Sequence, residues 1–513
     1  MEKRQYVTTA IDYPNAAPHM GHVLEKVLAD TIVRWFRLRG DDVRFQIGTD
    51  EHGIKIQQTA ERAQVTPRAL VDANVLLFRD LYDKLGISAD VFIRTSDQST
   101  HWPTVRALWK KLQEAGVLEK RTYTGLYCSG CERFVTKKDL VDGKCPDHQM
   151  PPQEVKEENW FFALREEGKN LQKLLETTYR IIPSFRENET FSLLKQGLED
   201  VSFSRPKSSL SWGIPVPGDE EQTMYVWCDA LTNYISGLGY FTDHDENKKF
   251  WEQGTVTHVI GKDIARFHAL IWPVMLKDAG VKTPDQLLIH GFLTSEGKKM
   301  SKSLGNVVKP DDVLAHFQGN PDPLRFYLSS EVHVGNDGDF SWKRIDELYN
   351  SKLRNQLGNM LNRVLVMIKK DDAELLIETT EALIDEVTAQ WKEYEGAFQG
   401  FELHKAIQQV TAWIDRINAG FSDAAPWKTK GVERTKVLSQ YAEMLRHVSL
   451  MLLPFIPQSA QGMSKQLGLS YAEKMPEKNF VITNEMKQWG GVKDWKSVGE
   501  PSILFPPLEK PVS

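Results

Sequence analysis

The first fifty residues change hydrophobic period twice, and this pattern limits the possible folds more than any other feature of the chain. Residues 6–14 (YVTTAIDYP) are rich in β-branched and aromatic side chains and run into a loop. Residues 20–40 then carry apolar side chains at helical spacing and close at a glycine. Residues 43–53 (VRFQIGTDEHG) alternate like a buried strand before a polar turn. A strand, a helix and a strand in this order predict the start of a parallel α/β sheet.

Ligands of a parallel α/β sheet bind beside the carboxyl ends of its strands. In this chain those ends would bring together three side chains, Tyr13, His19 and Asp50. The sequence therefore predicts a binding site at this edge of the sheet.

The α/β pattern is interrupted and then resumes. Between residues 116 and 224 it gives way to a cysteine-containing stretch and a turn-rich stretch, which we interpret as an insertion. Residues 224–235 and 257–276 restore the order of strand, turn and helix. From about residue 341 onward the chain consists of long amphipathic segments, which predict a helical bundle. We expect one sheet split by a smaller domain and followed by an all-α domain.

Composition narrows the class of protein. A chain of 513 residues exceeds what one hydrophobic core usually covers. Its apolar runs are too short to cross a bilayer, and the N-terminal stretch lacks the apolar core of a signal peptide, so we expect a cytoplasmic protein without membrane contact. A net charge of −6 argues against a basic coat over the whole molecule but permits a local basic face for a polyanion.

The cysteines point to a metal site instead of a disulfide scaffold. Cys128 and Cys131 are separated by two residues, as are Cys145 and His148. Two such pairs of soft ligands fit a closed, structural zinc site. The alternative is three buried thiols and a surface histidine. Cys228 lies away from this cluster and is most simply a core residue.

Residues 18–22 (PHMGH) begin the predicted helix, where free backbone N–H groups and the positive end of the helix dipole favour phosphate. His19 and His22 flank Met20 and Gly21, which has no side chain to keep a ligand from the backbone. For an isolated pair of histidines at this spacing, a histidine cap on a surface helix is the commoner explanation.

Residues 290–306 (HGFLTSEGKKMSKSLGN) place Lys298, Lys299 and Lys302 on a glycine-flanked loop. Such a cluster repels itself unless a polyanion is bound, and it could neutralise charge that develops as a phosphate group departs. The alternative is a solvated basic turn, which describes most runs of charge. We favour the phosphate site because both motifs occur on one α/β sheet.

Together, HMGH and KMSKS resemble the two nucleotide motifs of class I aminoacyl-tRNA synthetases, whose catalytic domain has a Rossmann-type fold. Within that class the chain is most similar to the methionyl-tRNA synthetase family. The similarity covers essentially the whole chain and includes GTDEHG, LYCSGCERF, YVWCDALTNY, IGKDIARFHALIWP and DAAPWK. Met20 stands where the first motif usually has isoleucine, and Asp12 where some relatives have proline or tyrosine.

The resemblance implies ATP-dependent attachment of L-methionine to tRNA(Met) through methionyl-adenylate, with Mg²⁺ accompanying ATP and one structural Zn²⁺. We expect a monomer, because the sequence shows no appended dimerisation domain after the bundle. The resemblance also implies six segments along the chain. These are 1–115 for the first half of the catalytic domain, 116–224 for the connective insertion, 225–289 for the second catalytic half, 290–345 for the KMSKS loop and stem-contact region, 346–480 for the anticodon-binding domain and 481–513 for a C-terminal docking segment.

The resemblance also implies four sets of site residues. The catalytic set is His19, His22, Lys299 and Lys302. The ATP-binding set is His19, Gly21, His22, Lys262, Asp263, His290, Gly291, Lys299, Met300, Ser301 and Lys302. The methionine-binding set is Ile11, Tyr13, Asp50, Trp227, Ala230, Leu231, Tyr234, Ile264 and His268. The anticodon-binding set is Asn359, Arg363 and Trp427.

Two other functions compete with this one. Isoleucyl, valyl and leucyl synthetases carry a much larger editing insertion than residues 116–224 allow, and a cysteinyl enzyme would use zinc at its substrate site. A non-catalytic RNA-binding relative would be expected to lose the phosphate motifs, and both are intact here.

Overall fold

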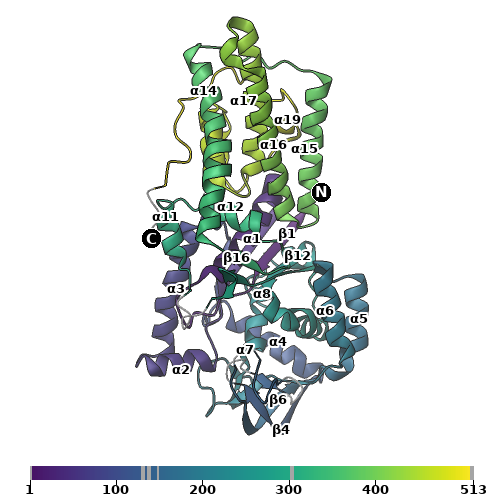
Figure 1. Cartoon of the computed structure of the whole chain (residues 1–513). Helices are drawn as coiled ribbons and strands as arrows, with labels where there is room; N and C mark the ends of the chain where they lie inside the picture. Colours follow the sequence, from purple (N-terminus) through teal and green to yellow (C-terminus); the bar gives the residue numbers. More distant parts are fainter. Residues whose placement is uncertain (1–2, 129–132, 136–139, 147–148, 301–305, 509–513) are drawn as a thin grey trace.

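The structure is a computed structural model that describes residues 3–128, 133–135, 140–146, 149–300 and 306–508. The α/β region lies in the middle of the molecule, with the helical bundle at one end and a smaller β-rich region that contains β4 and β6 at the other (Figure 1). Within the described ranges, no helix is long and apolar enough to cross a membrane.

A six-stranded sheet in the order β3-β2-β1-β12-β13-β7 forms the centre of the α/β region. Every neighbouring pair is parallel, as the sequence predicts. The strands are β1 (Arg4–Thr9), β2 (Asp42–Thr49), β3 (Val91–Arg94), β7 (Arg180–Ile182), β12 (Thr255–Gly261) and β13 (Gln286–His290). The strand order reverses between β1 and β12, which is where such sheets bind ligands.

Helices cover the sheet, and α1 is buried along almost its whole length. Its Trp35 ring stacks at 4.9 Å on Phe398 of the bundle, so that α1 lies between the sheet and the bundle. The helices of this region are α1 (Met20–Leu38), α2 (Ile54–Arg62), α3 (Pro67–Lys84), α4 (Trp102–Glu114), α7 (Val226–Leu231), α8 (Asn233–Ser236), α9 (Lys249–Glu252), the 3-10 turn η3 (Lys262–Ile264), the π-helix η4 (Phe267–Ile271) and α10 (Trp272–Asp278).

The interval expected to be one insertion is divided in the structure. A four-stranded sheet orders β5-β4-β6-β8 and a three-stranded sheet orders β10-β11-β9. Between β6 and β8, the chain returns to the central sheet as β7 and pairs with β13. The elements of this interval are β4 (Leu118–Cys128), β5 (Arg133–Val135), β6 (Gln153–Phe162), η2 (Arg165–Glu167), α5 (Gly168–Thr177), α6 (Ser184–Lys195), β8 (Val201–Ser202), β9 (Ser204–Pro206), β10 (Pro215–Val216) and β11 (Asp219–Met224).

A small sheet in the order β15-β14-β16 leads from the α/β region to the bundle. Its strands are β14 (Leu293–Ser295), β15 (Lys298–Lys299) and β16 (Gly338–Phe340), and the helices α11 (Pro310–His316) and α12 (Asp322–Glu331) separate β15 from β16. On α12, Arg325 is fully buried and lies 2.8 Å from Asp30 of α1, while its Nε donates to the carbonyl of Phe455 in the bundle. This side chain joins the two regions directly.

The predicted helical bundle is confirmed (Figure 1). It comprises α13 (Trp342–Leu348), the π-helix η6 (Tyr349–Gly358), α14 (Asn359–Lys370), α15 (Glu381–Gln399), α16 (Leu403–Ala424), η7 (Pro426–Lys428), α17 (Gly431–Leu452), α18 (Pro457–Gln466), η8 (Ala472–Lys474) and α19 (Asn484–Lys487). The segment after α19 has no regular structure up to residue 508 and buries Trp489, Trp495 and Phe505 against the bundle.

Candidate active site

His19 is the N-cap of α1, and its ring stacks on His22 with the centroids 3.9 Å apart. His19 Nδ1 accepts from the Gly21 N–H at 3.1 Å, and the His19 N–H donates to His22 Nδ1 at 3.1 Å. A side chain at position 21 would place its Cβ only 3.0 Å from the His19 ring, so glycine makes room for this cap. The sequence suggested free backbone N–H groups for phosphate here, but the histidines occupy two of them.

The cap determines which ring nitrogen of each histidine carries the proton and can donate a hydrogen bond. Burial lowers the pKa of His19, and burial together with the charges of His19 and Lys26 lowers the pKa of His22 far below its usual value. Both rings are therefore neutral near pH 7. Because each Nδ1 accepts a backbone N–H, the single proton of each ring is assigned to Nε2. Each ring then carries an Nε2–H donor, and the Nε2 of His22 lies 4.0 Å from Asp12 Oδ1.

A buried ionic cluster lies beneath this pair. Lys26 Nζ is 2.9 Å from Asp12 Oδ1 and 2.7 Å from Glu25 Oε1, and it also donates to the Ala10 carbonyl. Burial raises the pKa of Asp12 to about 6, although Lys26 acts in the opposite direction. Burial would also raise the pKa of Glu25, but Lys26 and His290 together outweigh burial and the pKa lies below its usual value. Sequence reasoning missed Glu25 and Lys26.

One wall of the predicted methionine pocket is well ordered by side-chain contacts. The Trp227 ring stacks on Phe267 with centroids 3.7 Å apart and meets His268 edge-on at 6.2 Å. His268 Nδ1 lies 3.0 Å from the Ile264 carbonyl, which can only accept, so this nitrogen carries the proton. The Tyr234 hydroxyl then donates to His268 Nε2 at 2.6 Å.

Burial lowers the pKa of His268 to about 4, so the ring is neutral near pH 7. His268 belongs to η4, and single turns of π-helix are common at functional sites. Ala230 and Leu231 follow Trp227 on α7 and are buried, and the half-buried Trp227 packs against the apolar core that contains Leu231. The structure thus brings together the six predicted residues Trp227, Ala230, Leu231, Tyr234, Ile264 and His268 around an uncharged, largely apolar wall.

The other predicted methionine residues follow the ends of β1 and β2. The Asp12 N–H donates to the Gly48 carbonyl and the Asp50 N–H donates to the Asp12 carbonyl, each at 2.8 Å. Ile11 and Tyr13 flank Asp12, and Lys55 Nζ lies 5.9 Å above the Tyr13 ring. The Asp50 side chain is 9% exposed. These residues therefore lie at the carboxyl edge of the sheet, as the sequence predicts.

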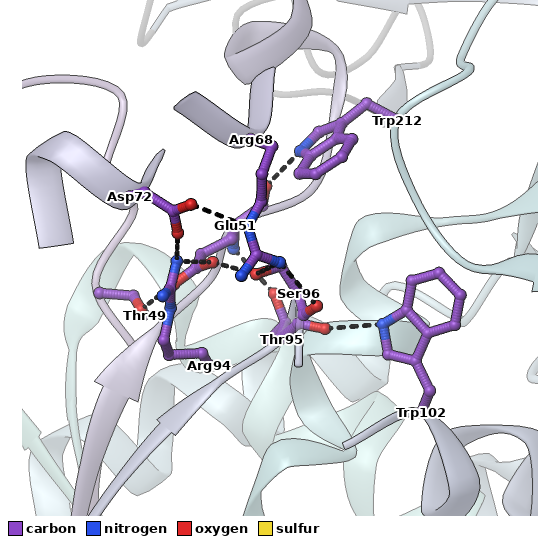
Figure 2. Close-up of polar contacts among 9 residues, drawn as sticks. All are labelled: Thr49, Glu51, Arg68, Asp72, Arg94, Thr95, Ser96, Trp102 and Trp212. Carbon is purple, nitrogen blue, oxygen red and sulfur yellow. Dashed lines mark hydrogen bonds and ion pairs between the residues drawn. The ribbon is translucent and has the colours of Figure 1, made fainter. Parts of the chain in front are cut away.

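Glu51 fixes the loop that bears Asp50 (Figure 2). Its carboxylate accepts from Arg94 Nε at 2.6 Å, from the Thr49 hydroxyl at 2.6 Å and from the Ser96 hydroxyl. Trp212, from the inserted region, donates its indole N–H to the Glu51 carbonyl at 2.5 Å (Figure 2). The sequence drew attention to this loop only for Asp50, and the supporting role of Glu51 was missed.

The edge expected to contact ATP carries ion pairs. Lys262 Nζ, predicted to meet the nucleotide, lies 2.6 Å from Asp337 Oδ1 and 2.8 Å from Oδ2. Asp337 also accepts the Phe292 N–H at 2.8 Å. Burial raises the pKa of the neighbouring Asp263. A Cβ at Gly291 would come within 2.1 Å of the Asn336 carbonyl oxygen, so only glycine allows this approach.

The KMSKS stretch is described only in part. Lys299 lies in β15, where its backbone is paired with Thr294, and Met300 packs against the large apolar core. Ser301 and Lys302 lie outside the described residues. At the foot of the loop, His290 Nε2 is 3.2 Å from Glu25 Oε2, which ties the end of β13 to α1.

Half of the predicted zinc site can be located. Cys128 and Cys145, one from each predicted ligand pair, are buried in the same small cluster with Val135. Cys131 and His148 lie outside the described residues. The part of the chain that the structure describes contains no cluster of three or more possible metal ligands. Cys228 is 2% exposed in the core, and burial raises the pKa of its thiol.

The predicted anticodon residues lie together at the bundle. Asn359 and Arg363 are on α14, and the Arg363 guanidinium lies 5.5 Å from the ring of Trp427 in η7. Trp427 is 46% exposed, so a large part of this side chain is open to solvent beside a cation. This combination suits stacking of an unpaired base.

Comparisons with known proteins show the family to which the chain belongs. A family model described as "tRNA synthetases class I (M)" matches residues 5–155 and 148–365, and a model described as "Anticodon binding domain of methionyl tRNA ligase" matches residues 372–493. The methionine–tRNA ligase of Fusobacterium nucleatum is 38% identical over 99% of this chain and 80% of its own length. That of Brucella suis is 40% identical over 90% of each chain.

Two solved structures of a methionyl-tRNA synthetase are similar to this chain over almost its whole length. Mycobacterium tuberculosis methionyl-tRNA synthetase in complex with methionyl-adenylate is 34% identical, has a TM-score of 0.89 and covers 99% of this chain and 100% of its own. The apo form of that enzyme is 31% identical, has a TM-score of 0.83 and covers 100% and 99%, respectively. The chain therefore belongs to the methionyl-tRNA synthetase family of class I tRNA synthetases.

Proposed function

We propose that this chain attaches L-methionine to tRNA(Met) in two steps. The methionine carboxylate attacks the α-phosphorus of ATP, which forms methionyl-adenylate and releases pyrophosphate. A hydroxyl of the terminal tRNA adenosine then attacks the carbonyl of this mixed anhydride and releases AMP. Family membership carries the proposal, and the neutral pocket wall around Trp227 and His268 supports methionine as the amino acid.

Neither step requires a nucleophile from the protein, so the residues act by positioning and by stabilising charge. His19 and His22 would donate from Nε2–H to the phosphates, and Lys299 and Lys302 would neutralise the departing pyrophosphate. Gly21, His290, Gly291, Met300 and Ser301 would line the ATP site, with Lys262 and Asp263 at its edge. Mg²⁺ would enter with the triphosphate and neutralise part of its charge.

On the amino-acid side, Asp50 would hold the ammonium group. The side chain would lie against the wall built by Trp227 and Tyr234 and its predicted neighbours. A linear, polarizable thioether suits such an aromatic surface, because no charge needs a partner there. At the far end of the molecule, Asn359, Arg363 and Trp427 would read the anticodon.

We propose a structural zinc ion held by Cys128, Cys131, Cys145 and His148. The two ligands that the structure describes fit such a site, because two thiols from separate turns are buried in one small cluster. Zinc would hold the tip of the β4 hairpin together and take no part in the reaction. Metal analysis of the purified protein should find about one zinc per chain. The six-segment division, the monomeric state and the cytoplasmic location stay predictions.

Amino-acid-dependent exchange of pyrophosphate into ATP tests the function. Across the twenty amino acids, we expect rapid exchange with methionine alone. Exchange driven by another amino acid would identify a different class I synthetase. Absence of exchange with every amino acid, accompanied by tRNA binding, would favour a non-catalytic RNA-binding relative.

A further inference from the structure

Asp229 lies buried behind the proposed methionine pocket and accepts from two histidines. Its Oδ2 is 2.6 Å from His52 Nδ1, and its Oδ1 is 2.7 Å from His101 Nε2. The three side chains are 0–2% exposed. Burial would raise the pKa of Asp229, but His52 and His101 outweigh it, so the pKa lies below its usual value. The group is therefore a carboxylate that accepts both hydrogen bonds.

These two bonds join three segments. His52 follows Asp50 by two residues, and Asp229 follows Trp227 by two residues on α7. His101 is the N-cap of α4, and its Nδ1 lies 2.7 Å from the Ser236 hydroxyl at the end of α8. One carboxylate thus connects the loop that would hold the methionine ammonium to the helix that forms the pocket wall.

The partners of Asp229 are themselves restrained. The Trp212 ring meets His52 edge-on at 5.4 Å, and Trp212 also donates to the Glu51 carbonyl (Figure 2). The Gly53 N–H donates to the Trp212 carbonyl. His52 is therefore clamped between Asp229 on one side and the inserted region on the other, so that movement of α7 would move the Asp50 loop.

We propose that Asp229 is a positioning residue that sets the distance between the Asp50 loop and the Trp227 wall, and thereby sets the affinity for methionine. The inference rests on the proposed function, because it needs methionine to span the two segments. A site gains affinity when both of its contact surfaces are held in place before the ligand arrives. Asp229 does not itself touch the substrate.

Variants at Asp229 separate hydrogen bonding from charge. Asp229→Ala removes both links. Asp229→Asn can keep both, because a neutral His52 can carry its proton on Nε2 and accept the amide N–H at Nδ1, while His101 still donates to the amide oxygen. At the partner position, His52→Asn keeps a donor near the Nδ1 site, whereas His52→Leu removes it.

The measurements are the Michaelis constants for methionine and for ATP in pyrophosphate exchange, and calorimetric binding of methionine without ATP. We expect Asp229→Ala and His52→Leu to weaken methionine about tenfold while the ATP constant stays within about twofold, since each loses hydrogen bonds to a charged group. Asp229→Asn and His52→Asn should stay within about threefold of wild type.

Glu443→Gln is the matched control. Glu443 is 1% exposed in the bundle and accepts from Arg446 at 2.7 and 2.8 Å. The variant should lower the unfolding midpoint without changing the ratio of the methionine and ATP constants. If Asp229→Ala does not fold, the two His52 variants make the same comparison.

Equal changes in both constants, or no change, in Asp229→Ala and His52→Leu would overturn the inference. Loss of methionine affinity in Asp229→Asn as large as in Asp229→Ala would also overturn it, because charge instead of position would then be responsible. A wild-type chain without methionine-dependent exchange would refute the proposed function, whereas wild-type exchange with an unchanged ratio in the variants refutes this inference alone.

Discussion

Around the proposed methionine wall, buried neutral side chains hold one another by hydrogen bonds, whereas the proposed nucleotide edge carries an ion pair closer to solvent. Tyr234 and His268 are each 1% exposed and bond at 2.6 Å. The Lys262 and Asp337 side chains, in contrast, are 26% and 46% exposed. A prebuilt apolar wall can receive a thioether without rearranging charge. At the other edge, paired charges have to exchange partners before they can meet a triphosphate.

Lys26 underlies both regions, so its replacement should have the largest effect on stability. Lys26→Met would leave Asp12 and Glu25 buried without their cation, which should lower the free energy of unfolding of the catalytic region by about 3–5 kcal/mol. Urea denaturation monitored by fluorescence measures this change. Lys343→Met, at a side chain that is 86% exposed, should stay within about 0.5 kcal/mol of wild type. Equal losses in the two variants would contradict a special role for the buried cluster.

Replacement of Lys302 tests the proposed nucleotide edge through the rate of adenylate formation. Lys302→Ala should slow adenylate formation by roughly two to three orders of magnitude, because one group that stabilises transition-state charge is worth about that much. Methionine binding should be nearly unchanged. Pre-steady-state pyrophosphate exchange measures the rate, with Lys309→Ala, at the exposed start of α11, as the control. Exchange at the wild-type rate in Lys302→Ala would remove it from the catalytic set.

The buried histidines predict how stability depends on pH. Burial lowers the pKa of His268 in the pocket and of His447 in the bundle to about 4. Between about pH 4 and pH 6.5 the unfolded chain therefore binds more protons, so stability is full above that window and falls as pH drops through it, by on the order of 3 kcal/mol per histidine.

Hydrogen exchange by mass spectrometry at several pH values can follow the two histidines separately, through peptides that contain η4 and α17. Both peptides should lose protection as pH falls from 6.5 toward 4. If protection of the His447 peptide changed with pH but protection of the His268 peptide did not, His268 would be accessible to protons in the folded state.

Tyr234→Phe probes the neutral wall. It removes the hydroxyl that donates to His268 Nε2 and leaves a buried acceptor without its partner, so the Michaelis constant for methionine should rise about tenfold and that for ATP should not. Tyr240→Phe loses a hydrogen bond to Glu252 that is remote from the pocket and should not change either constant. A similar effect of the two substitutions would mean that the Tyr234 hydroxyl matters only for folding.

Asp337→Asn probes the exposed ion pair and should have the smallest effect. The amide still accepts the Phe292 N–H but no longer neutralises Lys262, which is released toward the nucleotide. The Michaelis constant for ATP should fall by about twofold, as expected for an exposed pair worth under about 1 kcal/mol. Asp311→Asn, which breaks the exposed pair with Lys84, is the control. A weaker interaction with ATP in Asp337→Asn would show that the pair supports the site instead of restraining it.

Hydrophobic period was sufficient to predict the parallel sheet and the helical bundle, because both depend on local patterns. It failed for β7, since three residues within a turn-rich interval show no period. Resemblance supplied the pocket residues, and the structure groups Trp227, Tyr234 and His268 as expected. Assignment of the catalytic and binding roles still awaits experiment.

Other features lay beyond the reach of sequence reasoning for physical reasons. Glu25 and Lys26 are charged residues on a helix, which usually indicates the solvent face. Their burial is compensated by the pair that they form with each other and by contacts with Asp12 and His290, which are distant in sequence. Lys262 and Asp337 are 75 positions apart, so no local pattern links them. The histidine cap was considered as an alternative to a phosphate site, but the geometry of His19 and His22 allows both, because capping uses Nδ1 and leaves Nε2.

The return of β7 to the central sheet limits how this protein can be re-engineered. Removal of residues 116–224 as one cassette would strip an edge strand from the sheet and expose the backbone of β13. An exchange of parts between relatives has to cut on either side of β7, so that the hairpin of β4 and β6 is transplanted while α5, β7 and α6 stay behind. Residues 116–224 therefore contain two inserted parts, separated by a stretch that belongs to the central sheet and its helices.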